Sequence, residues 1–148
     1  YACSQACLPY LMEAANPHIL TIAPPLNMKA AWFKDHVAYT MAKYGMSMCV
    51  LGMAEEFRDR GIAVNALWPR TVIATAAIAL LGGAVRPENC RKPEIRADAA
   101  HAVLTREVAA SSGQFLLDDE VLATAGITDL APYAVEPGAA LQPDIFLD

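Results

Sequence analysis

The segment Ile62-Ala63-Val64-Asn65-Ala66-Leu67-Trp68 is an apolar run of the length of one β-strand, and it lies between Gly61 and Pro69. Proline has no backbone N–H and cannot continue a sheet ladder, so the strand is expected to end at Trp68. A nearly continuous apolar run is typical of a strand that is buried on both faces, as in a parallel sheet covered by helices. The run therefore predicts a strand in the interior of an α/β domain.

The sequence on the N-terminal side of this strand predicts a helix, a strand and a second helix, in that order: residues 1–15, 18–22 and 36–60. Pro9 is expected to bend or loosen the first helix, because it removes a backbone donor. Asp35 is the expected N-cap of the long helix, and Gly61 is expected to end it.

The C-terminal side predicts a short helix, a longer helix, a third strand and one or two helical turns: residues 75–81, 93–106, 114–118 and 119–125. Gly82-Gly83 is expected to end the short helix, and several prolines predict that the tail to Asp148 is loop. Helices and strands alternate along the whole chain, which predicts βαβ units and a parallel sheet. The chain is therefore expected to be part of one α/β domain.

The composition excludes several classes of protein. Eleven Lys and Arg residues against 16 Asp and Glu give a net charge of −5, the opposite of what nucleic-acid phosphates require. The mean hydropathy is +0.29, but the best apolar run, 72–81, is far shorter than the roughly 20 residues of a membrane helix. Four cysteines are too few for a disulfide scaffold, so a reducing compartment, the cytoplasm, is expected. No signal peptide is visible and the chain opens at Tyr1 inside an apparent helix, so we interpret it as part of a longer chain.

No metal site is expected. Cys3 and Cys7 share a helical face, but no second pair of ligands accompanies them. The three histidines are dispersed, and no two of them have the spacing that places both on one helical face. The run Asp118-Asp119-Glu120 is interpreted as the solvated first turn of a helix.

The most informative stretch for function is Tyr39-Thr40-Met41-Ala42-Lys43, inside the long helix. This spacing places the phenol of Tyr39 and the ammonium of Lys43 on one helical face, one turn apart. A nearby cation favours the phenolate and lowers the pKa of a tyrosine from its reference value of about 10. Such a tyrosine can exchange a proton with a substrate oxygen, and the ammonium can hold ribose hydroxyls. The alternative is an ordinary helical pair with a buried ring and a solvated amine.

Further stretches, spread over nearly the whole chain, accompany this pair: Asn16–Leu20, Pro24–Asn27, Trp32–Lys34, Ala38–Ser47, Val50–Phe57, Ala63–Thr71 and Leu141–Asp144. Together with the Tyr39–Lys43 pair they resemble the short-chain dehydrogenase/reductase family. The resemblance implies that residues 1–148 are the C-terminal part of one domain with a Rossmann-like, doubly wound parallel sheet. This part of the domain is expected to contribute three strands with intervening helices.

The resemblance implies an oxidoreductase that interconverts an alcohol and a carbonyl of a small molecule with NAD or NADP. Tyr39 is expected to donate and accept the proton, while Lys43 is expected to bind the nicotinamide ribose and lower the pKa of Tyr39. Pro69, Ile73 and Thr75 are expected to receive the nicotinamide carboxamide and the phosphates.

The long helix also bears on oligomeric state. In related dehydrogenases this helix forms dimer contacts, so exposed apolar residues on it would form a face between copies of the chain. Its methionines, Met41, Met46, Met48 and Met53, are expected to pack in the core or in such an interface.

Two features depart from the family pattern. Ala23 stands where the family has a serine that hydrogen-bonds the reacting oxygen, and Thr21 lies about 7 Å back along the strand. The eight glycines form no Gly-rich turn of the kind that holds a dinucleotide pyrophosphate, so that half of the domain is expected to be absent. A non-catalytic remnant or pseudoenzyme therefore stays open beside the enzyme.

Overall fold

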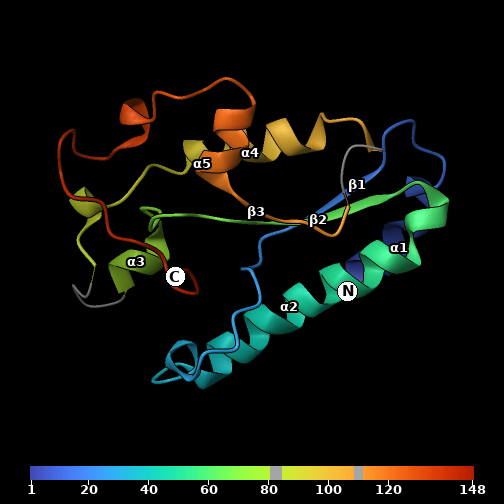
Figure 1. The fold of residues 1–148 in the computed structure, drawn as a ribbon, viewed down its shortest axis with the longest axis horizontal. Coiled ribbons are helices and arrows are strands. Elements are labelled where there is room, and N and C mark those ends of the chain that lie inside the picture. The colour runs from blue at the N-terminus through green and yellow to red at the C-terminus, as the bar shows by residue number, and fades with distance from the viewer. Residues whose placement is uncertain (81–84, 109–111) are drawn as a thin grey trace. The chain divides into compact units, whose positions relative to one another are not determined.

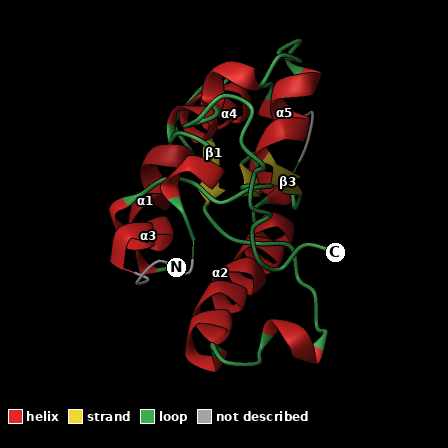
Figure 2. Cartoon of the chain, turned by 90° about the vertical axis from the view of Figure 1, so that its left-hand side faces the viewer, coloured by secondary structure: helices red, strands yellow, loops and turns green. Residues whose placement is uncertain are grey.

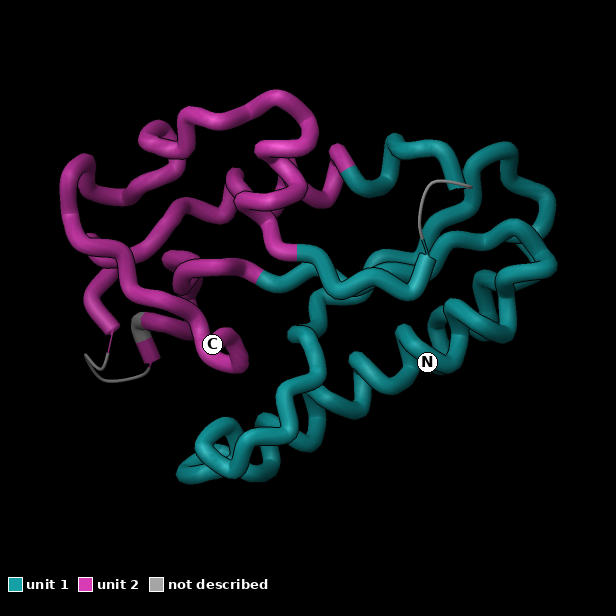
Figure 3. Tube along the Cα trace, in the orientation of Figure 1, with its two compact units in different colours: residues 1–68, 103–116 teal, residues 69–102, 117–148 magenta. Residues whose placement is uncertain are grey.

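The computed structural model describes residues 1–80, 85–108 and 112–148. The chain divides into two compact units (Figure 3). Unit 1 comprises residues 1–68 and 103–116, and unit 2 comprises residues 69–102 and 117–148. Within the described residues, no helix combines the length and the apolarity that crossing a membrane requires.

The strands confirm the prediction of a parallel α/β sheet. They form one sheet in the order β1-β2-β3: β1 (His18–Thr21), β2 (Ala63–Trp68) and β3 (Phe115–Leu117). β1 and β2 pair in parallel, with His18 opposite Ala63 and Thr21 opposite Ala66. Every residue of β2 is buried, because this strand is central in the sheet and apolar on both faces.

Helices α1 (Ala2–Leu11) and α2 (Val37–Glu56) contribute to the core of unit 1. α2 is a long helix that runs along one face of the sheet (Figures 1 and 2). Its buried apolar residues join residues from the strands and loops in one cluster: Ala23, Val50, Met53, Ala54, Phe57, Ile62, Val64 and Ala66. Leu8 and Leu11 of α1 pack against this cluster, which fixes α1 although none of its residues is fully buried.

Both ends of α2 differ from the prediction. The N-cap is His36 rather than Asp35, and no side chain caps the helix. Asp35 instead adopts a left-handed backbone conformation with φ of 67°, which turns the chain before the helix begins. At the other end a 3₁₀ turn, Arg58–Arg60, follows α2, and Gly61 ends it with φ of 66°. The sequence predicts that the long helix continues to Arg60 and ends at Gly61. The α-helix instead ends at Glu56, and Gly61 ends the 3₁₀ turn that follows.

The described residues of unit 2 include α3 (Ala76–Leu80), most of α4 (Glu94–Leu104) and α5 (Asp118–Thr124). The predicted terminator Gly82-Gly83 lies outside the described residues. The tail is mostly loop, as predicted, apart from a 3₁₀ turn at Ala131–Tyr133. Isolated β-bridges join it to the rest of the unit: Thr71 with Pro143 and Arg91 with Ala134.

The acidic run begins α5, as predicted, and Glu120 is exposed, but the expected solvation is wrong for Asp118. Asp118 is fully buried, and its Oδ1 accepts hydrogen bonds from the N–H groups of Arg70 (3.0 Å) and Asp119 (2.9 Å). Asp119 and Glu120 form ion pairs with the guanidinium of Arg70. Burial raises the pKa of the Asp118 carboxyl, although the two backbone donors oppose this effect. The run therefore fixes both the backbone and the side chain of Arg70.

Replacing Asp118→Ala should lower the free energy of unfolding by about 1–3 kcal/mol, because the N–H groups of Arg70 and Asp119 lose their acceptor. The folded-state pKa of Asp118 lies above its unfolded value of about 4, so its contribution is largest below that value and declines as pH rises through the folded pKa. Urea denaturation of both proteins at neutral and at mildly acidic pH measures this. The stability difference should grow on acidification, and a difference that shrinks would contradict the assignment.

Candidate active site

Tyr39 and Lys43 lie on one face of α2, as their spacing predicts. The Tyr39 side chain is 46% exposed, whereas Lys43 is half-buried. The Lys43 Nζ lies 6.0 Å from the centroid of the Tyr39 ring. An ordinary pair with a buried ring and a solvated amine is thus not what the structure shows: the phenol is accessible and the amine is held.

The ammonium of Lys43 is held at the carboxyl ends of two neighbouring strands. Its Nζ donates a hydrogen bond to the carbonyl oxygen of Ile22 (3.2 Å), the residue that follows β1. It also lies 5.3 Å from the centroid of the Trp68 ring, at the end of β2. In open α/β sheets, ligands bind outside the carboxyl ends of the strands. Lys43 is therefore at the edge where a ligand of this fold is expected.

Three buried hydroxyl side chains hold the β1–α2 loop (residues 22–36) against α2. They occupy one helical face, at spacings of four and three residues, and each donates to a main-chain carbonyl of the loop. The bonds run from Thr40 to Trp32 (2.6 Å), from Tyr44 to Asn27 (2.5 Å) and from Ser47 to Pro24 (2.7 Å). With Lys43, these residues form what we call the polar face of α2.

Tyr44 shows how this face combines packing with hydrogen bonding. Its ring meets Phe33 edge to face, with centroids 5.5 Å apart and an interplanar angle of 88°. Burial raises the pKa of the Tyr44 phenol, although the bond to Asn27 opposes this. The phenol therefore stays protonated and remains a donor to the loop.

Sequence reasoning did not assign roles to Thr40, Tyr44, Ser47 or Trp68. For the three hydroxyl residues a signal exists, because they recur on one face of an otherwise apolar helix beside a proline-containing loop. For Trp68 the sequence offers only its place at a strand end, since its approach to Lys43 depends on how α2 packs on β2.

Ala23, which stands where the family has a serine, is buried in the structure. Ala23 is 1% exposed and belongs to the apolar core cluster of unit 1, together with Val50 and Ala66. The Cβ of Ala23 therefore packs in the core, one residue after Ile22, whose carbonyl accepts the Lys43 ammonium.

Ala23→Ser should lower the free energy of unfolding by about 1–3 kcal/mol, because a hydroxyl buried among apolar side chains lacks a hydrogen-bond partner. Ala38→Ser, at an exposed position of α2, is the matched control and should cost only about 0.5 kcal/mol from helix propensity. Denaturant unfolding of the three proteins compares them. Equal stability of the Ala23→Ser protein and the wild type would show that the hydroxyl finds a partner there.

The other predicted site residues belong to unit 2. Pro69 and Ile73 are buried, and Thr75 is exposed immediately before α3, where its carbonyl accepts the N–H of Ile78 (3.0 Å). Ile73 and Arg91 form a parallel bridge. The structure thus brings Tyr39 together with Lys43 in unit 1, and it describes Pro69, Ile73 and Thr75 within unit 2.

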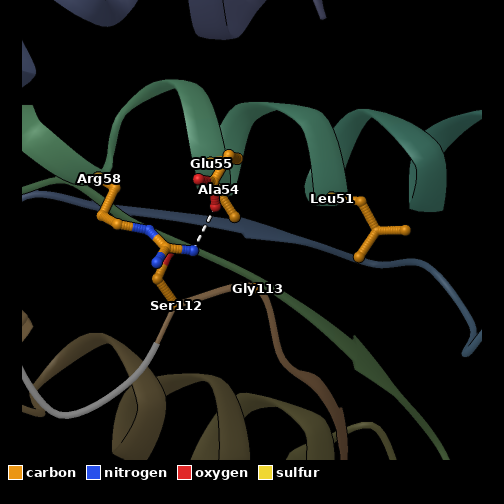
Figure 4. A pocket seen from close by; sticks show the side chains of 6 residues that line it. All are labelled: Leu51, Ala54, Glu55, Arg58, Ser112 and Gly113. Carbon is orange, nitrogen blue, oxygen red and sulfur yellow. Dashed lines mark hydrogen bonds and ion pairs between the residues drawn. The ribbon is translucent and has the colours of Figure 1, made fainter.

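A separate hollow of about 470 Å³ lies near the C-terminal end of α2 (Figure 4). Its lining residues are Leu51, Ala54, Glu55, Arg58, Ser112 and Gly113. The charged side chains there neutralise each other, because Arg58 pairs with Glu55. The Ser112 Oγ accepts the N–H of Val64 (3.0 Å), so this hydroxyl is already bonded to strand β2. The hollow includes neither Tyr39 nor Lys43 and is not the predicted site.

Comparison with known proteins decides the family. A family model described as "Enoyl-(Acyl carrier protein) reductase" matches residues 1–128. The chain belongs to the short-chain dehydrogenase/reductase family. Among the residues that the structure describes, no group of three or more His, Cys, Asp or Glu could hold a metal ion.

Several relatives of this family are very similar to the chain. "Hydroxysteroid dehydrogenase-like protein 2" of Danio rerio is 57% identical over 148 residues, which are 100% of this chain and 35% of that protein. The chain thus spans about a third of the length of the curated relatives it matches.

Two crystal structures of dehydrogenases also match almost the whole chain. A "putative dehydrogenase" from Xanthomonas campestris is 64% identical, with a TM-score of 0.94, over 99% of this chain and 53% of that one. A short chain dehydrogenase from Mycobacterium thermoresistibile is 48% identical, with a TM-score of 0.89, over 100% and 52%. These matches confirm both the resemblance and the Rossmann-like α/β fold that it implied.

Proposed function

We propose that this chain supplies the proton-transfer part of an oxidoreductase that interconverts an alcohol and a carbonyl of a small molecule with NAD or NADP. The observation that carries the proposal is the accessible phenol of Tyr39 beside an anchored ammonium, that of Lys43. Membership in a family whose similar members are named dehydrogenases supports it.

Tyr39 is the proton donor and acceptor in this proposal. In reduction its hydroxyl gives a proton to the substrate oxygen, and in oxidation the phenolate takes that proton back. The cation of Lys43 favours the phenolate electrostatically, and the bond to Ile22 keeps the cation near the Tyr39 ring. Because the Tyr39 side chain is half-exposed, a substrate can reach it.

In this proposal, residues of unit 1 bind the nicotinamide ribose, and the family resemblance assigns the carboxamide to residues of unit 2. The phenol of Tyr39 and the ammonium of Lys43 match ribose hydroxyls. In unit 2, the backbone N–H of Arg91 donates to the carbonyl of Val72 (3.0 Å), and the backbone carbonyl of Arg91 accepts the N–H of Ala74 (2.8 Å). In a parallel bridge of this kind, Ile73 directs its own N–H and C=O away from Arg91.

We assign this donor and acceptor of Ile73 to the nicotinamide carboxamide, with Pro69 and Thr75 beside it in sequence. The bound cofactor supplies or removes the hydride. The 148 residues contain no Gly-rich turn that fits the pyrophosphate, so we assign the pyrophosphate to residues outside them. In this proposal, the chain corresponds to the C-terminal part of one dehydrogenase domain.

The alternative of a non-catalytic remnant or pseudoenzyme is not favoured. Its main support is an alanine in place of the family's serine, and the accessible Tyr39 beside Lys43 weighs against it, because both proton-transfer residues are present. The remaining support is that these 148 residues contain no Gly-rich turn, and they match only 53% of the Xanthomonas campestris dehydrogenase.

A homo-oligomer through α2 is also part of the proposal. Met53 packs in the core, whereas Met41, Met46 and Met48 are exposed on the helix together with Leu51. Exposed apolar side chains gathered on one long helix favour an interface with another copy of the chain.

All four cysteines are free thiols, which supports the proposal of a reducing compartment such as the cytoplasm.

The test is a chimera in which this chain replaces the matching part of the Xanthomonas campestris relative, so that a complete domain is present. Steady-state reduction of a panel of ketones and aldehydes is measured with NADH and NADPH. Tyr39→Phe should lower kcat by about 10²- to 10⁴-fold, because the ring has no proton to transfer. Lys43→Met should raise the cofactor KM and move the pH profile to higher pH, because the phenolate loses its cation.

Tyr10→Phe is the matched control, because Tyr10 is an exposed tyrosine of α1 outside the site. It should leave the kinetics unchanged. Full activity of the Tyr39→Phe chimera would remove the proposed mechanism.

A further inference from the structure

Trp68 combines near-complete burial with a close approach to a charge. It is the last residue of β2 and is 4% exposed. The Lys43 Nζ lies over its ring, 5.3 Å from the centroid, closer than the 6.0 Å to the Tyr39 ring. The face of an indole attracts a cation more strongly than the face of any other side-chain ring. The contact is therefore of a kind that can hold an ammonium in place.

Two rigid elements hold the ring and the cation. Trp68 ends the central strand of the sheet, and Pro69 follows with its fixed φ. Lys43 lies in the N-terminal half of α2, between Thr40 and Tyr44, which both bond to the β1–α2 loop. The geometry between ring and ammonium thus depends on packed backbone rather than on flexible chain ends.

The carbonyl of Ile22 and the ring of Trp68 act on Lys43 in different ways. The carbonyl accepts one N–H of the ammonium in a fixed direction (3.2 Å). The ring attracts the positive charge as a whole. This attraction offsets part of the hydration free energy that a half-buried ammonium has lost. An apolar side chain of similar volume would fill the same space without this attraction.

We infer that Trp68 is a positioning residue of the site: its indole face holds the charged Lys43 ammonium beside the Tyr39 ring, where the proposed proton transfer needs it. This inference rests on the proposed function, in which Tyr39 and Lys43 act as a pair. Trp68 itself acts only through Lys43.

The first test is a spectroscopic signature in the chain itself. A methylene group above an indole face is shielded, so the ε-protons of Lys43 should resonate upfield of those of the exposed lysines Lys29 and Lys34. Trp68→Leu should abolish this shift, Trp68→Phe should retain part of it, and Tyr39→Leu should leave most of it. An upfield shift that survives Trp68→Leu and vanishes in Tyr39→Leu would overturn the inference.

The second test is a double-mutant cycle in the chimera described above. Trp68→Leu should lower kcat/KM by about 2- to 30-fold, the range expected for loss of a cation–π contact, and Trp68→Phe should restore most of it. In the Lys43→Met background, Trp68→Leu should have no further effect, whereas a purely structural role would give the same loss in both backgrounds. Equal losses would therefore overturn the inference.

The remaining outcomes are also decisive. If Trp68→Leu does not fold, Trp68→Phe decides: a reduced Lys43 shift supports the inference, and an unchanged shift overturns it. If Tyr39→Phe keeps full activity, the proposed function fails. If Tyr39→Phe is inactive but Trp68→Leu behaves as wild type, only the inference about Trp68 fails.

Discussion

Hydrogen bonds from the polar face of α2 to main-chain carbonyls of the β1–α2 loop connect the helix that carries Tyr39 with the strand edge where a ligand is expected. The donors Thr40, Tyr44 and Ser47 are buried, and their acceptors belong to a loop with little regular structure of its own. A buried carbonyl without a donor costs free energy, so this face compensates for bonds that the loop cannot make within itself. The same face holds Lys43, through Ile22.

This constraint explains how one helix serves packing and chemistry together. Val50, Met53 and Ala54 fix α2 on the sheet, while Tyr39 remains accessible near the other end of the helix. The ammonium of Lys43 meets the carboxyl ends of β1 and β2, where the Ile22 carbonyl and the Trp68 ring surround it. A proton-transfer pair on a packed helix needs little reorganisation when a substrate arrives, which is the condition for efficient electrostatic support.

Local patterns in the sequence predict the features that depend on neighbouring residues. The apolar run 62–68 predicts the buried central strand, and the spacing of Tyr39 and Lys43 predicts their shared face. Gly61 predicts a stop, although the α-helix itself already ends at Glu56. Contacts between distant residues are not visible in such patterns. The sequence around Asp118 predicts a solvated helix start. The structure buries Asp118 because its carboxylate accepts the N–H of Arg70, which lies 48 residues away in sequence. Trp68 meets Lys43 only because α2 packs on β2, and the burial of Ala23 depends on α2 residues such as Val50.

Amide hydrogen exchange tests most directly whether the polar face of α2 fixes the β1–α2 loop. The N–H groups of Trp32 and Phe33 are bonded within the 3₁₀ turn Ala30–Trp32 (both 3.0 Å), so their exchange reports whether the loop is held. The account predicts that both amides are protected in the wild type and exchange faster in a Tyr44→Phe, Ser47→Ala double variant. The amide of Ala66 in β2, bonded to Gln114 (2.8 Å), should keep its protection and serves as the internal control. Equal exchange of Trp32 and Phe33 in both proteins would contradict the account.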